Sequence, residues 1–94
     1  MNKYVQNLKI GDEVVLDLSY YKDKIFIHRY VKVKICNITK SGRITVHYGR
    51  NKLTFQSNLS GWGNNYFLVN FENESEVIKY NAYRNYINYK DSIK

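Results

Sequence analysis

Apolar and polar residues alternate through much of the first 71 positions, as they do in strands that bury one face. The stretch LKIGDEVVLDL opens with a Gly-Asp turn and then alternates, and its apolar face is formed by Val14, Leu16 and Leu18. Shorter runs of the same kind follow as ITVHY, KLTFQ and YFLVNF. We predict one strand for each of these four stretches.

The longest alternating run, IFIHRYVKVKICNI, covers residues 25–38 without a Gly or Pro. Its apolar positions keep one parity except at Arg29 and Ile38. We therefore predict one long strand that bends or bulges near Arg29 and is irregular again before Ile38. The tip KSGR that follows supplies Gly42 for the positive φ of a tight turn, and GRN makes the next turn. We assign SYYKDK and SNLSGWGNN to loops.

The period changes after residue 71, where the spacing of apolar residues becomes helical. Asn73 stands three residues before Glu76, a helix-start signature close to a capping box, so we predict a helix over about 73–92. The helix carries two apolar stripes on nearly opposite sides. The first is Ile78, Ala82, Tyr86, Tyr89 and Ile93, and the second is Tyr80, Tyr83 and Ile87.

We predict that the first stripe docks on the strands, because one small sheet needs only one apolar helix face. The second stripe is then predicted to be a protein interface, most simply the seam of a homodimer. The alternative is that tyrosine is amphipathic enough to lie exposed without a partner.

Five short strands with turn signals between them, followed by one helix, favour a mainly β fold. We predict a small five-stranded antiparallel SH3-like barrel with a C-terminal helix. A chain of 94 residues fits a single domain. The barrel is expected over about 8–71 and the helix over about 73–92.

The order LKIGDEVVL, VKVKICNITKSGRITV, KLTF and YFLVNFENESEVIKYNAYRNYI resembles the small β-barrel proteins that abound in bacteriophage genomes. Those proteins show a Gly-Asp turn, a Lys-containing strand that leads into a Gly-Arg hairpin, an Ile-Thr-Val strand and a polar helix. This chain departs from them in its Tyr-rich helix, where the family more often has Glu and Arg. The resemblance implies a barrel and a phage or prophage origin, and it implies no settled activity and no site residue.

Charge changes the picture most, because the formal net charge of +7 is unevenly distributed. Residues 20–52 hold nine Lys and Arg residues against Asp23 alone, and residues 53–71 hold no charge. We predict a basic β face edged by tyrosines, since cations contact phosphates and flat rings stack on bases. The alternative is a solvated face that keeps a small protein in solution. The candidate binding residues are Lys22, Lys24, Tyr30, Lys32, Lys34, Lys40, Arg43, Arg50 and Lys52.

The chain carries no catalytic signature and no glycine-rich phosphate motif. Cys36, His28 and His47 are too few for a structural zinc site unless carboxylates join them. We expect the two histidines to face solvent, and the alternative is a metal-binding or proton-transfer role. The two histidines could lie close together if their strands pair, since both fall on the outward parity. No apolar run could span a membrane and the N-terminus lacks the apolar core of a signal peptide. We therefore expect a cytoplasmic protein, in the host cytoplasm if phage-encoded, that is not an enzyme and needs no cofactor or metal.

Two functions remain open from the sequence. The first is a non-enzymatic accessory protein that binds nucleic acid, or another acidic surface, through the basic face. The alternative is a protein-interaction inhibitor of a host defence system, of the anti-CRISPR or anti-restriction type, that blocks a nucleic-acid or protein site. Salt dependence separates them, because phosphate binding weakens steeply as salt rises.

Overall fold

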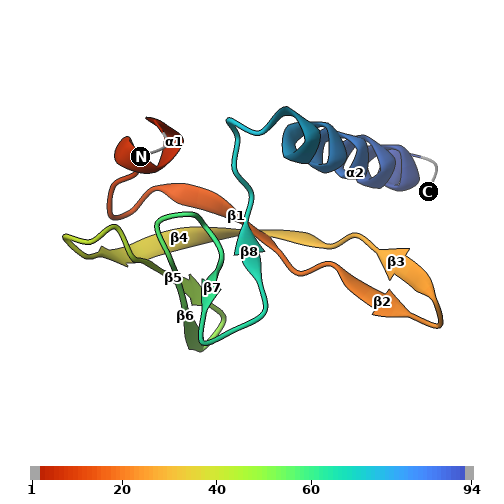
Figure 1. Ribbon diagram of the computed structural model, residues 1–94. Coiled ribbons are helices and arrows are strands. Elements are labelled where there is room, and N and C mark those ends of the chain that lie inside the picture. Colours follow the sequence, from red (N-terminus) through yellow and green to blue (C-terminus); the bar gives the residue numbers. More distant parts are fainter. Residues whose placement is uncertain (1–2, 93–94) are drawn as a thin grey trace.

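The computed structural model describes residues 3–92 as a curved antiparallel sheet followed by a long helix (Figure 1). This confirms the predicted mainly β class with one C-terminal helix, although the described residues form eight strands in place of five. The elements are α1 (Lys3–Gln6), β1 (Glu13–Asp17), β2 (Tyr20–Lys22), β3 (Ile25–Ile27), β4 (Tyr30–Ile38), β5 (Ile44–Tyr48), β6 (Asn51–Phe55), β7 (Gly61–Trp62), β8 (Phe67–Leu68) and α2 (Glu74–Ser92).

Six strands form the main sheet in the order β7-β6-β5-β4-β1-β8, and β2 pairs with β3 in a separate hairpin. The main sheet curls back on itself, because an isolated bridge joins Ser60 to Phe67 beside its two end strands. Two further backbone bonds close the same seam, from Gly61 N to Tyr66 O and from Leu68 N to Leu59 O, each at 2.9 Å. The sheet is therefore barrel-like and nearly closed.

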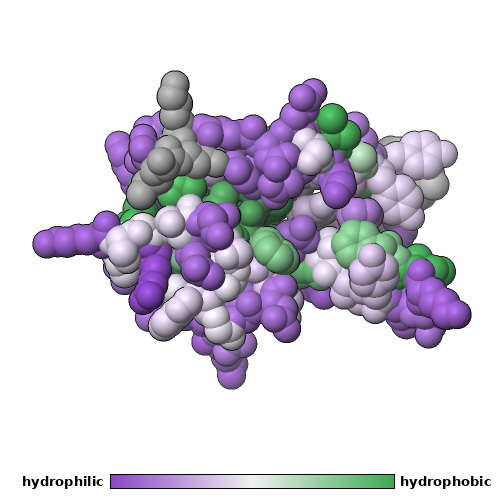
Figure 2. Space-filling model, viewed as in Figure 1, coloured by the Kyte–Doolittle hydropathy of each residue, from purple (hydrophilic) through white to green (hydrophobic). Residues whose placement is uncertain are grey.

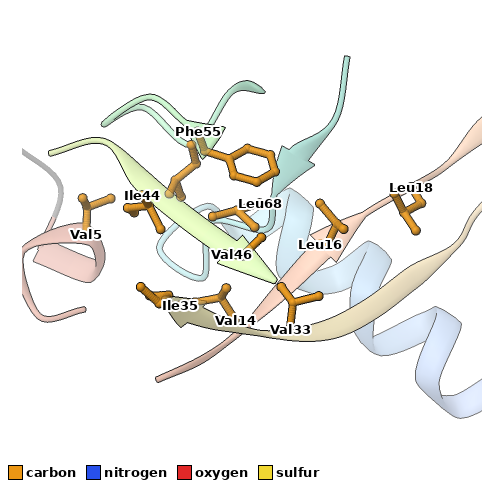
Figure 3. Close-up of a cluster of buried hydrophobic side chains, with 11 residues drawn as sticks. Val5, Val14, Leu16, Leu18, Val33, Ile35, Ile44, Val46, Phe55 and Leu68 are labelled. Atoms are coloured by element: carbon orange, nitrogen blue, oxygen red, sulfur yellow. The ribbon is translucent and has the colours of Figure 1, made fainter. Parts of the chain in front are cut away.

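The interior is filled by the apolar parity that the sequence predicts (Figure 3). Antiparallel pairing places Leu16 of β1 opposite Leu68 of β8, and Ile35 of β4 opposite Val46 of β5. Side chains of the same parity on paired strands point to one side of a sheet. The fully buried members are Val14, Leu16, Ile35, Ile44, Val46, Phe55 and Leu68.

The single strand predicted for residues 25–38 is wrong, because β3 and β4 belong to separate sheets, but both predicted irregularities are present. β3 ends at Ile27 and β4 begins at Tyr30, so the chain leaves the strand at the predicted bend. The pairing of β4 with β5 shifts register between Ile35 and Asn37. This bulge reverses the parity, and Ile38 consequently packs against the core.

The loop predicted for SYYKDK is wrong, because Tyr20–Lys22 pairs with Ile25–Ile27. Asp23 and Lys24 make the turn between them with φ of 51° and 67°. A two-residue turn with positive φ at both positions matches the twist of a hairpin. The hairpin projects from the barrel at the right-hand end of the molecule in Figure 1.

The predicted start of the C-terminal helix is confirmed. Asn73 caps α2, since its Oδ1 accepts hydrogen bonds from the N–H groups of Ser75 (3.1 Å) and Glu76 (3.4 Å). The Glu76 carboxylate reaches back to accept a bond from the N–H of Asn70 at 3.3 Å. These contacts anchor the first turn of the helix to the segment that follows β8.

The predicted docking face of α2 is wrong. Tyr80 is only 6% exposed, whereas Ile78 and Tyr86 are both 60% exposed. Ala82 and Tyr89 of the first stripe are also exposed, and Ile93 lies outside the described residues. The second stripe faces the sheet instead, where Tyr80 is buried and Tyr83 and Ile87 are half-buried. Tyr80 is therefore not free for a partner, and the homodimer seam at Tyr80, Tyr83 and Ile87 stays a prediction.

The physical reason lies on the outer surface of the sheet, which offers aromatic partners at the right place. Tyr80 packs with Val15 and Val69 in a second, smaller core. The ring of Tyr30 meets Tyr80 edge-on at 5.5 Å, and Phe71 meets it at 5.6 Å. Edge-to-face ring pairs of this kind stabilise beyond the area they bury. α2 therefore covers the outer face of β1 and the beginning of β4.

Candidate nucleic-acid interface

α2 leaves uncovered the outer surface of β5, β6, β7 and the later part of β4, which carries polar and basic side chains. Cross-strand pairs define its rows: Asn37 with Thr45, Thr45 with Thr54, Thr54 with Trp62, and His47 with Lys52. Lys34 and Arg43 share this outward side, because their neighbours Ile35 and Ile44 are buried. We call this surface the β4–β7 face; its members are Lys34, Asn37, Arg43, Thr45, His47, Lys52, Thr54 and Trp62.

Trp62 is the largest side chain on the β4–β7 face and is 52% exposed. The guanidinium carbon of Arg43 lies 4.4 Å from the centroid of the Trp62 ring, which is cation–π geometry. Beside them the hydroxyls of Thr45 and Thr54 are bonded at 3.1 Å. The sequence prediction missed Trp62 because GWG reads as a loop. Its pairing with β6, which only the structure shows, places it on the sheet.

The electrostatics of this face are one-sided. Residues 24–71 contain no Asp or Glu, so β4 to β7 and their turns supply no carboxylate. Among residues 4–90, whose side chains the structure describes, the one ion pair joins Lys32 to Glu13 at 3.9 Å. Lys34, Arg43 and Lys52 are exposed and form no ion pair among those residues. One carboxylate borders the face, because Glu13 of β1 stands opposite Lys34 in the sheet. The cations outnumber it, so their charges add to a positive field.

The nine predicted binding residues do not form one surface. Lys34, Arg43 and Lys52 lie on the β4–β7 face, and Lys40 and Arg50 border it in the β4–β5 and β5–β6 turns. Lys32 lies beside α2, in a small hollow that Tyr83 and Ile87 also line. Lys22 and Lys24 belong to the β2–β3 hairpin, at the opposite end of the molecule from the β4–β5 turn (Figure 1).

Tyr30, the remaining predicted binding residue, supports the helix instead. Its ring contacts Tyr80 and also Tyr83, at 5.1 Å, so α2 occupies the surface that a base would need. Burial raises the pKa of the Tyr30 hydroxyl above its ordinary value, and the nearby Asp17 carboxylate raises it further. We therefore leave Tyr30 out of the interface.

A second feature is a groove of about 470 Å³ between α2 and the β2–β3 hairpin. Figure 2 shows hydrophobic surface on the helix and on the hairpin below it. Aromatic rings run along the hairpin into this region, from Tyr21 to Phe26 at 4.8 Å and from Phe26 to His28 at 4.7 Å. The groove is lined by Ile27, His28, Ile78, Lys79, Ala82, Tyr83 and Tyr86. The sequence prediction missed it because it placed α2 the other way round.

The expectation that His28 and His47 lie close together is wrong. His28 stacks on Tyr30 at the start of β4, whereas His47 follows Val46, which pairs with Ile35. Six or seven strand residues therefore separate the two imidazoles, roughly 20 Å along the sheet. Residues 3–92 contain no group of three or more His, Cys, Asp or Glu side chains placed to hold a metal ion.

None of the helices described in residues 3–92 is long and apolar enough to cross a membrane. Comparison with protein-family models, with curated proteins and with solved structures finds no match to this chain. Any function assigned to it must therefore be argued from the charge and geometry of its own surface, where the β4–β7 face is the most distinctive feature.

Proposed function

We propose that the protein is a non-enzymatic nucleic-acid-binding protein whose β4–β7 face contacts the phosphate backbone. One observation carries the proposal: exposed cations stand on neighbouring strands of a chain segment that contains no carboxylate. A protein gains affinity for nucleic acid by neutralising phosphates with Lys and Arg, which releases condensed counterions. Lys40 and Arg50, at the two bordering turns, extend the same positive field.

The composition of the face supports a binding role over that of a merely solvated surface. A surface that only keeps a small protein in solution mixes both signs of charge. Here the hydroxyl groups of Thr45 and Thr54 and the amide of Asn37 lie among the cations, and such groups commonly contact phosphate and sugar oxygens. The face therefore combines point charges with neutral hydrogen-bonding groups. Since contacts to phosphate and sugar carry no sequence information, we expect little sequence preference.

The test compares two variants, each of which loses three positive charges, from the β4–β7 face in one and from elsewhere on the surface in the other. Lys34→Ser/Arg43→Ser/Lys52→Ser is expected to weaken binding of a fluorescently labelled oligonucleotide at low salt at least about tenfold, and to reduce the slope of log K against log salt by about 2. The control, Lys22→Ser/Lys24→Ser/Lys79→Ser, removes the same charge from the hairpin and the helix. It is expected to bind nearly as the parent does, as measured by fluorescence anisotropy.

Two results would contradict the proposal. If both triple variants lose affinity equally, overall charge and not the β4–β7 face drives binding. If the parent binds no nucleic acid at low salt, the proposed function fails outright. Thermal melts of both variants show whether the fold is kept.

The setting we propose, that of a phage or prophage accessory protein in the host cytoplasm, rests on the sequence resemblance to phage barrel proteins. A second candidate function, the protein-interaction inhibitor, is favoured by the groove between α2 and the β2–β3 hairpin. Ile78 and Tyr86 are both 60% exposed there, more apolar surface than a small domain needs to show. Lys79 lines the groove, and Lys22 and Lys24 lie on the hairpin, so an acidic amphipathic segment of a partner protein would match it in charge.

A peptide-display selection from a random library tests this second function. Peptides selected on the parent are expected to combine Asp or Glu with large apolar residues, and to lose binding to an Ile78→Asp variant. The reason is that a carboxylate in the groove repels an acidic peptide and removes its apolar contact. Selected peptides that bind the variant as well as the parent would show that the groove is not their site.

A further inference from the structure

We infer that the β4–β7 face takes single-stranded nucleic acid, with one base stacked on Trp62. The inference rests on the proposed function and goes beyond it, because phosphate contacts alone do not distinguish single strands from duplex. What distinguishes them is an exposed ring that a free base can reach and a paired base cannot.

The position of Trp62 in the fold carries the first step. It lies on β7, the end strand of the main sheet, and pairs with Thr54. About half of its surface is open to solvent at the edge of a face whose charged groups are all cations. An indole usually contributes its large apolar area to a core or an interface. The core of this barrel is complete without it, since Gly61 and not Trp62 stands opposite the buried Phe55.

The ring is held in a fixed place, which carries the second step. The guanidinium of Arg43 lies over it at 4.4 Å, so the ring cannot turn freely without losing that contact. The loop after Trp62 is fastened by Asn64, whose Nδ2 donates to the carbonyl of Thr54 at 3.0 Å and whose Oδ1 accepts from the N–H of Tyr66 at 3.0 Å. A Cβ at Gly61 would overlap Asn64, so the glycine lets this tight loop form. An ordered ring costs less entropy to use in binding.

The chemistry of the surroundings carries the third step. A base in a single strand can leave its neighbours and stack on an aromatic ring, whereas a base in a duplex is already paired and stacked. Arg43 takes one face of the Trp62 ring, so a base would stack on the other face. The adjoining phosphates would then lie within the field of Arg43 and Lys52. This combination of a cationic groove or face with a stacking ring is how proteins bind single strands with little regard to sequence. We therefore assign single-stranded DNA or RNA as the ligand class.

The test uses the fact that the chain contains one tryptophan. Selective excitation of indole therefore reports on Trp62 alone. The parent is titrated with an oligothymidylate, with the duplex that this strand forms with its complement, and with inorganic polyphosphate, which has charge but no bases. Stacking predicts strong quenching by the single strand, weaker quenching by the duplex and none by polyphosphate.

Two variants add a readout that does not depend on fluorescence quenching. By anisotropy of a labelled strand, Trp62→Ala is expected to lose roughly tenfold in affinity for the single strand. Its affinity for the duplex should stay within about twofold of the parent, because phosphate contacts remain. Trp62→Phe keeps a smaller ring and is expected to bind single strands with intermediate affinity, which guards against a Trp62→Ala variant that folds poorly.

The outcomes separate this inference from the proposed function. If labelled strands bind the parent but neither variant changes single-strand affinity, stacking on Trp62 is overturned and phosphate binding stands. Equal quenching by polyphosphate and by the single strand would also overturn stacking, since the emission change would then report charge alone. If no nucleic acid binds at low salt, the proposed function fails and the inference fails with it.

Discussion

Tyr80→Asp is expected to detach α2 from the barrel, whereas Ile78→Asp, two residues earlier, is expected to leave the stability nearly unchanged. Tyr80 is 6% exposed and sits among the rings of Tyr30 and Phe71, while Ile78 is 60% exposed. Replacing Tyr80 removes those contacts and puts a charge where water is excluded, at a cost of about 3 kcal/mol or more. For a domain of this size that lowers Tm by more than about 12 °C.

Thermal and denaturant unfolding, followed by circular dichroism, measure both variants. The pair is well matched, because each introduces one carboxylate into the same helix, two positions apart. Ile78→Asp should melt within a few degrees of the parent, as exposed substitutions usually do. If Ile78→Asp proves the more damaging change, α2 docks through the stripe that contains Ile78 and Tyr86, and the groove beside it does not exist.

The orientation of α2 shows what periodicity can and cannot predict. Helical spacing locates an apolar stripe, but this helix has two, and tyrosine is at home both in a core and at a surface. The choice between them depends on what the sheet presents. The ring of Tyr80 packs against Tyr30 on β4 and Phe71 after β8. The hydrophobic pattern of the sequence does not show that these rings meet in the folded chain. The cap at Asn73 is local and was predicted correctly.

The strands likewise divide into those that the hydrophobic pattern predicts and those that it does not. β4, β5 and β6 each bury one face, so their alternation appears in the sequence, as does the change of parity at the bulge before Ile38. β1 is buried on both faces, because α2 covers Val15, and this the sequence did not indicate. β2 and β7 could not be predicted, because Tyr20–Lys22 is exposed on both faces and Gly61–Trp62 is only two residues long. What makes them strands is pairing with β3 and β6, and pairing is not written in the hydrophobic pattern.

The sequence predicted the excess of positive charge at the candidate site but not which cations share one surface. The absence of Asp and Glu from residues 24–71 can be counted directly, and it led to nine predicted binding residues. Three of them, Lys34, Arg43 and Lys52, lie on the β4–β7 face, and their binding role stays a prediction. Which cations share a surface depends on the bend after Ile27 and on the cover that α2 provides. Because the chain bends after Ile27, Lys22 and Lys24 lie on the β2–β3 hairpin at one end of the molecule. Lys32 lies beside α2.

Phe55→Ala is expected to have the largest effect on stability of any single truncation in the barrel. Phe55 heads the fully buried side chains in size, with no exposed surface. It stands opposite Ile44 on β5 and Gly61 on β7, so it fills the interior where the last strands of the sheet curl over (Figure 3). Removing the ring loses its transfer free energy and leaves a cavity that packed neighbours cannot close, at a cost of about 3–5 kcal/mol.

Denaturant unfolding measures the loss, and Lys52→Ala on the same strand is the control, expected within about 0.5 kcal/mol of the parent because its side chain is exposed. Small domains have roughly 5–15 kcal/mol in all, so Phe55→Ala removes a large share of the total. A loss below about 1 kcal/mol would mean that the sheet is not closed around Phe55. β7 is paired only through Thr54 and Phe55 in the described sheet, so the same result would also remove the support that places Trp62 on the β4–β7 face.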